Sequence, residues 1–192
     1  MADEKSPNFT SPIDQQHHPS LKAEMWVWLR DVAFAVALAL VIIVFLYQPV
    51  KVEGTSMAPL LSDQERIFIN KFVYRFEPIH RDDVIVFWYP LDRSESFIKR
   101  VIGLPGDTIE IREGKLYING QKVNEPYVPR RYFDDSSYGP VTIPRNQYFV
   151  MGDHRDSSND SRIFGPVSRK YIYGKAVFAY WPFRRFGEIS AP

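Results

Sequence analysis

The pattern of hydrophobic and polar positions divides the chain into three regions. Residues 1–24 are mostly polar and contain three prolines, and this composition predicts a disordered tail. The next segment is almost uniformly apolar, and no charged residue occurs between Val32 and Tyr47. Beyond Val50, short runs of Ile, Val, Phe and Tyr alternate with polar turns, which is the pattern of β-strands.

The apolar segment has the length and composition of a single transmembrane helix over residues 25–48. A helix needs about 20 residues to cross a bilayer. Trp26 and Tyr47, near its two ends, suit the interfacial aromatic belts, and Pro49 is expected to end the helix. A cleaved signal peptide is the alternative, but no small-x-small cleavage site follows the segment. We therefore predict an uncleaved membrane anchor.

The flanking charges leave the orientation of this anchor undecided. Lys22 and Arg30 lie before or near its start, and Lys51 and Arg66 follow its end. The positive-inside rule therefore gives a tie. A buried helix of a soluble domain is disfavoured, because the segment is apolar on every face.

Residues 49–192 are predicted to form one mainly β domain. Asn119-Gly120 is a strong signal for a two-residue hairpin, and Leu104 to Asp107 fits a type II turn with glycine at the position of positive φ. Residues 123–147 contain four prolines and are predicted to be a long loop or an extended excursion. The predicted strands lie in the runs RIFINKFVY, DVIVFWY, SFIKRVIG, DTIEIRE, KLYINGQKV, QYFVMG and IYGKAVFAYWPF.

Composition excludes several classes of function. The 192 residues carry a formal net charge of +1 without a long basic run, which argues against a nucleic-acid-binding surface. The chain has no cysteine, so disulfides, cysteine-based metal sites and thiol nucleophiles are excluded. The last two of the four histidines, His80 and His154, lack the close spacing of a histidine-rich metal site, and no metal or organic cofactor is predicted.

The stretch EGTSMAPLL places Ser56 directly after the apolar segment, where it is either a turn residue or a nucleophile. A serine nucleophile needs a base. His80 and His154 lie in polar stretches, and we interpret both as solvated loop histidines. Lys99 is the other candidate, because strand alternation places Phe97 and Val101 on its face, and burial lowers the pKa of an amine. The alternative is an edge-strand lysine that discourages aggregation.

Three motifs in this order, GTSMAP, FIKRVIGLPGD and GDHRDSSNDSRIFGPV, resemble those of the type I signal peptidases, from the anchor to about Trp181. These are membrane-anchored Ser-Lys endopeptidases that remove signal peptides from exported proteins. The resemblance implies Ser56 as nucleophile and Lys99 as general base. It also implies a lysine-orienting hydroxyl at Ser158, a substrate-binding role for Met57, and a charge cluster that braces the site, made of Arg100, Asp153, Asp160 and Arg162.

The sequence departs from the family pattern at three positions. Gly54 stands where many members have a serine whose hydroxyl helps to stabilise the oxyanion. Leu60 replaces a common threonine, and His154 replaces a more usual asparagine. None of these departures touches Ser56 or Lys99, so we expect them to affect the catalytic rate more than the catalytic identity.

The resemblance also implies a fold, a location and partners. The fold would be the family's antiparallel-sheet catalytic domain, outside the cell membrane, with a cytoplasmic N-terminus. The partners would be preprotein signal peptides, bound in extended form along a strand edge, and the lipid membrane. Two alternatives stay open: a membrane-anchored, non-catalytic β-rich binding or assembly protein, and a related Ser-Lys processing peptidase with a dedicated substrate.

Overall fold

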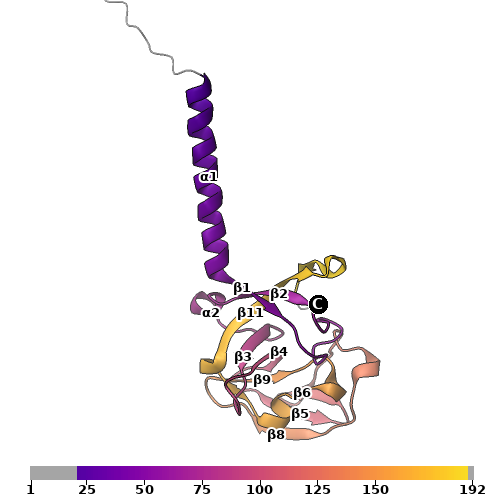
Figure 1. Ribbon diagram of the computed structural model, residues 1–192. Helices are drawn as coiled ribbons and strands as arrows, with labels where there is room; N and C mark the ends of the chain where they lie inside the picture. Colours follow the sequence, from indigo (N-terminus) through magenta and orange to yellow (C-terminus); the bar gives the residue numbers. More distant parts are fainter. Residues whose placement is uncertain (1–20, 190–192) are drawn as a thin grey trace, which may run out of the picture. The chain divides into compact units, whose positions relative to one another are not determined.

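The computed structural model describes residues 21–189, which form two units that meet between Ile42 and Ile43 (Figure 1). Most of the predicted tail, residues 1–20, lies outside the described residues. The first unit is the greater part of helix α1 (Leu21–Leu46), and the second is a β domain that continues to Ile189.

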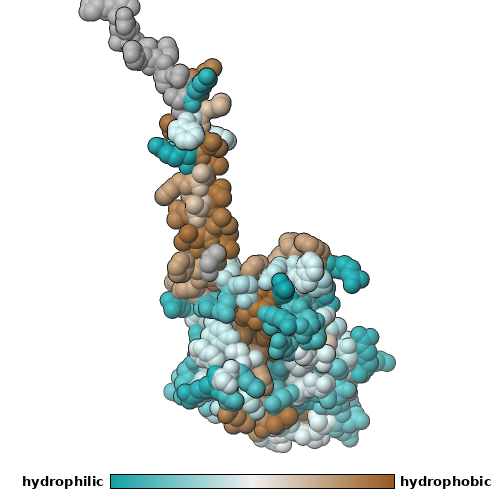
Figure 2. All heavy atoms as spheres, in the orientation of Figure 1, coloured by the Kyte–Doolittle hydropathy of each residue, from teal (hydrophilic) through white to brown (hydrophobic). Residues whose placement is uncertain are grey.

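Helix α1 is apolar around its whole circumference. Every described side chain from Leu21 to Ile43 is exposed, and the stretch Glu24–Ile43 is long and apolar enough to span a membrane. Figure 2 shows this helix covered mainly with hydrophobic residues, whereas the visible surface of the β domain is mostly hydrophilic or neutral. In water the exposed apolar side chains would be unfavourable, so the helix has the surface expected of a membrane span.

The helix ends at Leu46, three residues before the predicted stop at Pro49. The reason is that strand β1 (Tyr47–Lys51) begins immediately and pairs antiparallel with β2 (Arg66–Asn70). Pro49 is tolerated there because β1 is an edge strand, and an edge strand need not donate every backbone N–H. Tyr47 consequently belongs to the sheet and not to the end of the helix.

The β domain consists of two antiparallel sheets, as the sequence predicts for its fold class. The larger sheet has the order β1-β2-β11-β3-β4-β9-β10, with β12 paired to β11. Its remaining strands are β3 (Val84–Trp88), β4 (Ser96–Gly103), β9 (Gln147–Met151), β10 (Val167–Ser168), β11 (Ile172–Trp181) and β12 (Gly187–Glu188). The smaller sheet has the order β7-β6-β5-β8, with β5 (Thr108–Arg112), β6 (Lys115–Ile118), β7 (Gln121–Lys122) and β8 (Tyr138–Thr142).

The predicted turns form as their residue types require. Asn119 and Gly120 both have positive φ, 53° and 78°, and join β6 to β7. Gly106 has φ +91°, and the Asp107 N–H donates to the Leu104 carbonyl at 3.0 Å. Both turns are therefore confirmed.

The excursion over residues 123–147 is partly ordered into regular structure. It contains the 3-10 helix η1 (Arg130–Tyr132) and strand β8, which pairs with β5. The sequence did not predict β8, because Gly139 and Pro140 lie inside it and both disfavour strands. The short helices of the domain are α2 (Val73–Phe76), α3 (Ser161–Phe164), η2 (Arg155–Ser157), η3 (Arg169–Tyr171) and η4 (Phe183–Arg185).

Strand β4 passes through the centre of the hydrophobic core. The core has three clusters of buried residues, and Ile98, Val101 and Ile102 of β4 pack into a different cluster each. Closely packed interiors restrict side-chain positions. The two cations that lie between these anchors, Lys99 and Arg100, are therefore held in fixed places.

Candidate active site

The structure brings Ser56 and Lys99 together, although they lie 43 residues apart in the sequence. The distance between Ser56 Oγ and Lys99 Nζ is 2.7 Å. Ser56 lies in the turn after β1, where the Ala58 N–H donates to the Thr55 carbonyl at 2.9 Å. Lys99 lies on β4 opposite Ile85 of β3, in the middle of the larger sheet. A hydroxyl in a turn thus lies beside an amine on an inner strand of the sheet, and the edge-strand interpretation of Lys99 is wrong.

The amine of Lys99 lies in largely apolar surroundings. The residue is only 4% exposed, and its Nζ lies 5.2 Å from the centroid of the Phe97 ring. It donates to the Ile98 carbonyl at 3.1 Å, and no carboxylate among residues 21–189 forms an ion pair with it. Burial lowers the pKa of Lys99 to about 8, while the more distant Asp160 and Asp153 act in the opposite direction. A substantial fraction of the amine is therefore neutral under mildly alkaline conditions.

Arg100, the next residue on β4, is buried with a carboxylate partner. Its Nε and Nη2 donate to the two carboxylate oxygens of Asp153 at 2.8 Å and 2.7 Å, and both side chains are fully buried. Nη1 donates to the Asp82 carbonyl at 3.1 Å, and the guanidinium stacks over the Tyr127 ring at 4.1 Å. This bidentate pair ties β4 to the segment that follows β9.

Asp160 and Arg162 form a second pair in that segment. Asp160 accepts from the Gly152 N–H at 3.1 Å and from Arg162 Nε at 2.9 Å, and its side chain caps helix α3. Arg162 also donates to Asp134 and to the Arg155 carbonyl. The four residues of the predicted charge cluster are thus present as two ion pairs, and a third pair joins Arg155 to the buried Glu125.

The segment after β9 packs directly against Ser56. A Cβ on Gly152 would lie 2.4 Å from the Ser56 carbonyl oxygen and 2.3 Å from Ser158 Oγ, so only glycine fits there without rearrangement. Ser158 Oγ is buried and has no hydrogen-bond partner within residues 21–189. Its predicted role in orienting Lys99 therefore stays a prediction.

A cavity of about 330 Å³ opens at Ser56 and Lys99. Its wall includes the buried Met57 and residues of the edge strand β1. Its apolar lining comes from strands β1, β3 and β4 and from the segment between β1 and β2, and includes Val50, Val52, Met57, Val86, Phe97 and Ile98. The cavity can hold small apolar side chains beside the Ser56 hydroxyl.

The two candidate histidines differ in their surroundings. His80 is exposed, as predicted. The solvated interpretation is wrong for His154, which is half-buried, has its ring centroid 3.9 Å from that of Tyr132, and contacts Thr55 and Asp156. The contacts with Tyr132 and Thr55 could not be predicted from the sequence, because they join segments that are far apart in the chain.

Comparisons with known proteins show the family of this chain. The family model described as signal peptidase, peptidase S26, matches residues 25–181. The chain is 38% identical over 190 residues to signal peptidase I of Bacillus licheniformis, covering 93% of this chain and 100% of that one. It is 41% identical over 182 residues to signal peptidase I S of Bacillus subtilis (strain 168), covering 89% and 97%. A crystal structure of a signal peptidase I from Enterococcus faecalis V583 is 35% identical, with a TM-score of 0.47 over 52% of this chain and 97% of that one. The chain therefore belongs to the signal peptidase family, peptidase S26.

Proposed function

We propose that this signal peptidase is a serine endopeptidase with a Ser-Lys dyad that removes N-terminal signal peptides from exported preproteins at the membrane surface. The observation that carries the proposal is the 2.7 Å distance between Ser56 Oγ and the Nζ of Lys99, a lysine buried without an ion-pair partner in the described part of the chain. A neutral lysine can accept a proton, whereas a charged one cannot.

The proposed reaction has two stages. Neutral Lys99 takes the hydroxyl proton while Ser56 Oγ attacks the scissile carbonyl, and the protonated lysine then gives the proton to the leaving amine. Water attacks the resulting acyl-enzyme in the second stage, with Lys99 again acting as base. The Ser56 N–H is the proposed oxyanion donor, since none of the hydrogen bonds found among residues 21–189 uses it.

The supporting residues keep the dyad in place. Two ion pairs are proposed to hold the segment after β9 against the turn that carries Ser56, namely Arg100–Asp153 and Asp160–Arg162. The buried, unpartnered hydroxyl of Ser158 supports its proposed role as the group that directs the lone pair of Lys99.

The substrate is proposed to bind in extended form beside the edge strand β1. Edge strands present unpaired backbone groups, which an extended peptide can pair with. Small side chains before the cleaved bond would enter the apolar cavity, with Met57 as part of its wall. Larger side chains would be excluded from this limited volume.

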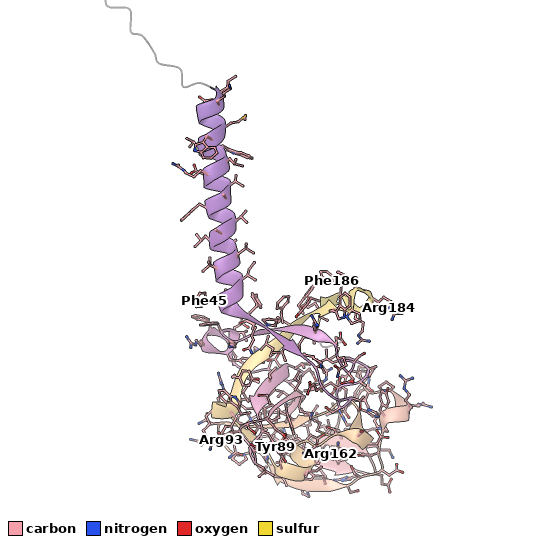
Figure 3. The ribbon with its side chains drawn as sticks, in the orientation of Figure 1. Phe45, Tyr89, Arg93, Arg162, Arg184 and Phe186 are labelled. Atoms are coloured by element: carbon pink, nitrogen blue, oxygen red, sulfur yellow. The ribbon has the colours of Figure 1, made fainter. Side chains whose placement is uncertain are left out.

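The membrane is the second proposed partner. Helix α1 is the proposed anchor, with residues 1–24 in the cytoplasm and the β domain outside. The segment at the end of β11 exposes Trp181, Phe183 and Phe186, which suit an interface with lipid. Figure 3 labels Arg184 and Phe186 in this segment.

Protease added outside intact cells should digest the β domain. Digestion only from the cytoplasmic side would reverse the proposed topology.

The catalytic proposal is tested with the full chain in detergent or vesicles and a full-length preprotein. Ser56→Ala and Lys99→Ala should each abolish cleavage, and the double variant should be no worse than either single variant, because the two residues act as a unit. Mass spectrometry should place the cut at the end of the signal peptide. A cut elsewhere would favour a peptidase with a dedicated substrate, and a folded, active Ser56→Ala variant would end the proposal.

A further inference from the structure

His154 holds the main chain on both sides of the Ser56 α-carbon. Its ring Nδ1 lies 3.2 Å from the Thr55 carbonyl oxygen, and its backbone N–H donates to the Ser56 carbonyl at 3.1 Å. The ring packs against that of Tyr132, with the two centroids 3.9 Å apart and the ring planes tilted by 43°. One residue thus contacts two successive carbonyls of the turn that carries the nucleophile.

The contact with Thr55 has a consequence for the Ser56 N–H. The Thr55 C=O and the Ser56 N–H belong to the same peptide group, which is planar, so the direction of one fixes the opposite direction of the other. The Thr55 carbonyl accepts from the Ala58 N–H at 2.9 Å and faces His154 Nδ1 as a second donor. Two donors on this oxygen restrict rotation of the peptide group more than the turn alone would.

The second ring nitrogen faces an acceptor as well. His154 Nε2 lies 3.0 Å from Asp156 Oδ1, so each ring nitrogen faces an oxygen that can only accept. Arg131 lies over the Tyr132 ring, and Arg155, the residue after His154, is paired with Glu125. With both nitrogens directed at acceptors, the ring has the geometry of a donor and not that of a base for Ser56.

We propose that His154 is a positioning residue that aims the Ser56 N–H at the oxyanion formed during cleavage. This inference rests on the proposed Ser-Lys function. Gly54 makes this positioning role more important, because a glycine at this position provides no side-chain hydroxyl as a second oxyanion donor. The N–H of Ser56 must therefore be well oriented by other means, and His154 is the side chain that contacts its peptide group.

The first test compares two substitutions of His154 in the full chain. His154→Leu removes the Nδ1 donor and puts an apolar side chain of similar bulk in its place. We expect kcat to fall about 10- to 100-fold, with KM little changed. This loss is smaller than that expected from removing a whole oxyanion donor. His154→Asn should recover most of this loss, because its Nδ2 is as many bonds from the main chain as Nδ1 of histidine. His80→Leu, at the exposed histidine, is the matched control and should behave as wild type.

The second test measures the oxyanion directly. A peptide aldehyde with the substrate sequence forms a tetrahedral adduct with Ser56, whereas the matching peptide alcohol does not. His154→Leu should weaken binding of the aldehyde in proportion to the loss of kcat and leave binding of the alcohol unchanged. Equal weakening of both, or a normal kcat in a folded His154→Leu variant, would overturn the positioning role. Activity in Ser56→Ala would instead refute the underlying dyad.

Discussion

Lys99 and Arg100 are neighbours on β4 and both are buried, but only Arg100 has an ion-pair partner within the described residues. Arg100 is fully buried with both oxygens of Asp153 as partners. Lys99 is nearly as buried, but its Nζ contacts a hydroxyl and a carbonyl and forms no ion pair within the described residues. The first arrangement keeps a positive charge permanently, and the second makes a positive charge unfavourable.

Burial alone therefore does not define the role of a cation in this domain. Pairing with Asp153 makes Arg100 a structural connection between two segments, whereas the absence of pairing makes Lys99 a candidate base. Burying the Lys99 amine without a charged partner lowers the stability of the folded domain. The folded domain binds a proton at Lys99 with a pKa of about 8, against 10.5 for the free side chain.

The same substitution at the two positions should therefore have opposite effects on stability. Arg100→Met should lower the free energy of unfolding by about 3–5 kcal/mol, because Asp153 stays buried without its partner. Lys99→Met should raise the free energy of unfolding by about 3 kcal/mol at pH 7. The folded and unfolded pKa values of Lys99 differ by about 2.5 units, and each unit corresponds to about 1.36 kcal/mol. The measurement is urea unfolding of the full chain in detergent.

The stability difference between the wild type and Lys99→Met should depend on pH in a predictable direction. Between pH 8 and 10.5 the unfolded chain binds more protons at Lys99 than the folded chain, so wild-type stability rises with pH there. The advantage of Lys99→Met should shrink through this window and vanish above it. Arg100→Met with Asp153→Leu is the control and should recover part of the loss. Destabilisation by Lys99→Met at pH 7 would contradict the expected cost of burying the charged Lys99 amine.

A carboxylate placed beside Lys99 should make it resemble Arg100. Phe97 is half-buried and its ring lies 5.2 Å from Nζ, so Phe97→Asp brings a negative charge to the same strand face. The pKa of Lys99 should rise by about 1–3 units, and less if solvent enters the site. Activity of the wild type should increase as pH rises through about 8, where Lys99 loses its proton.

The measurement is kcat/KM against pH for the wild type and Phe97→Asp. The rising limb of the variant should be displaced to higher pH. Phe97→Leu, which keeps the face apolar, should leave the midpoint close to that of the wild type. An identical midpoint in Phe97→Asp would show that a group other than Lys99 controls the rate.

Much of this architecture is predictable from local sequence. The strand SFIKRVIG has the predicted bounds, because alternation and β-branched residues act over a few neighbours. The hairpin at Asn119-Gly120 follows from the same kind of local preference. The end of α1 and the presence of β8 did not follow, because pairing with strands elsewhere in the chain overrides the local signals of Pro49 and Pro140.

The apolar strand face of Lys99 and the order of the three motifs can be read from the amino-acid sequence alone. The 2.7 Å distance from Ser56 Oγ to Lys99 Nζ, the Glu125–Arg155 pair and the contact of His154 with Thr55 become visible only in the folded domain. The two groups of features differ in the range of the interactions that produce them. Periodicity and turn chemistry depend on adjacent residues, whereas these contacts join segments that meet only when both sheets have packed around β4.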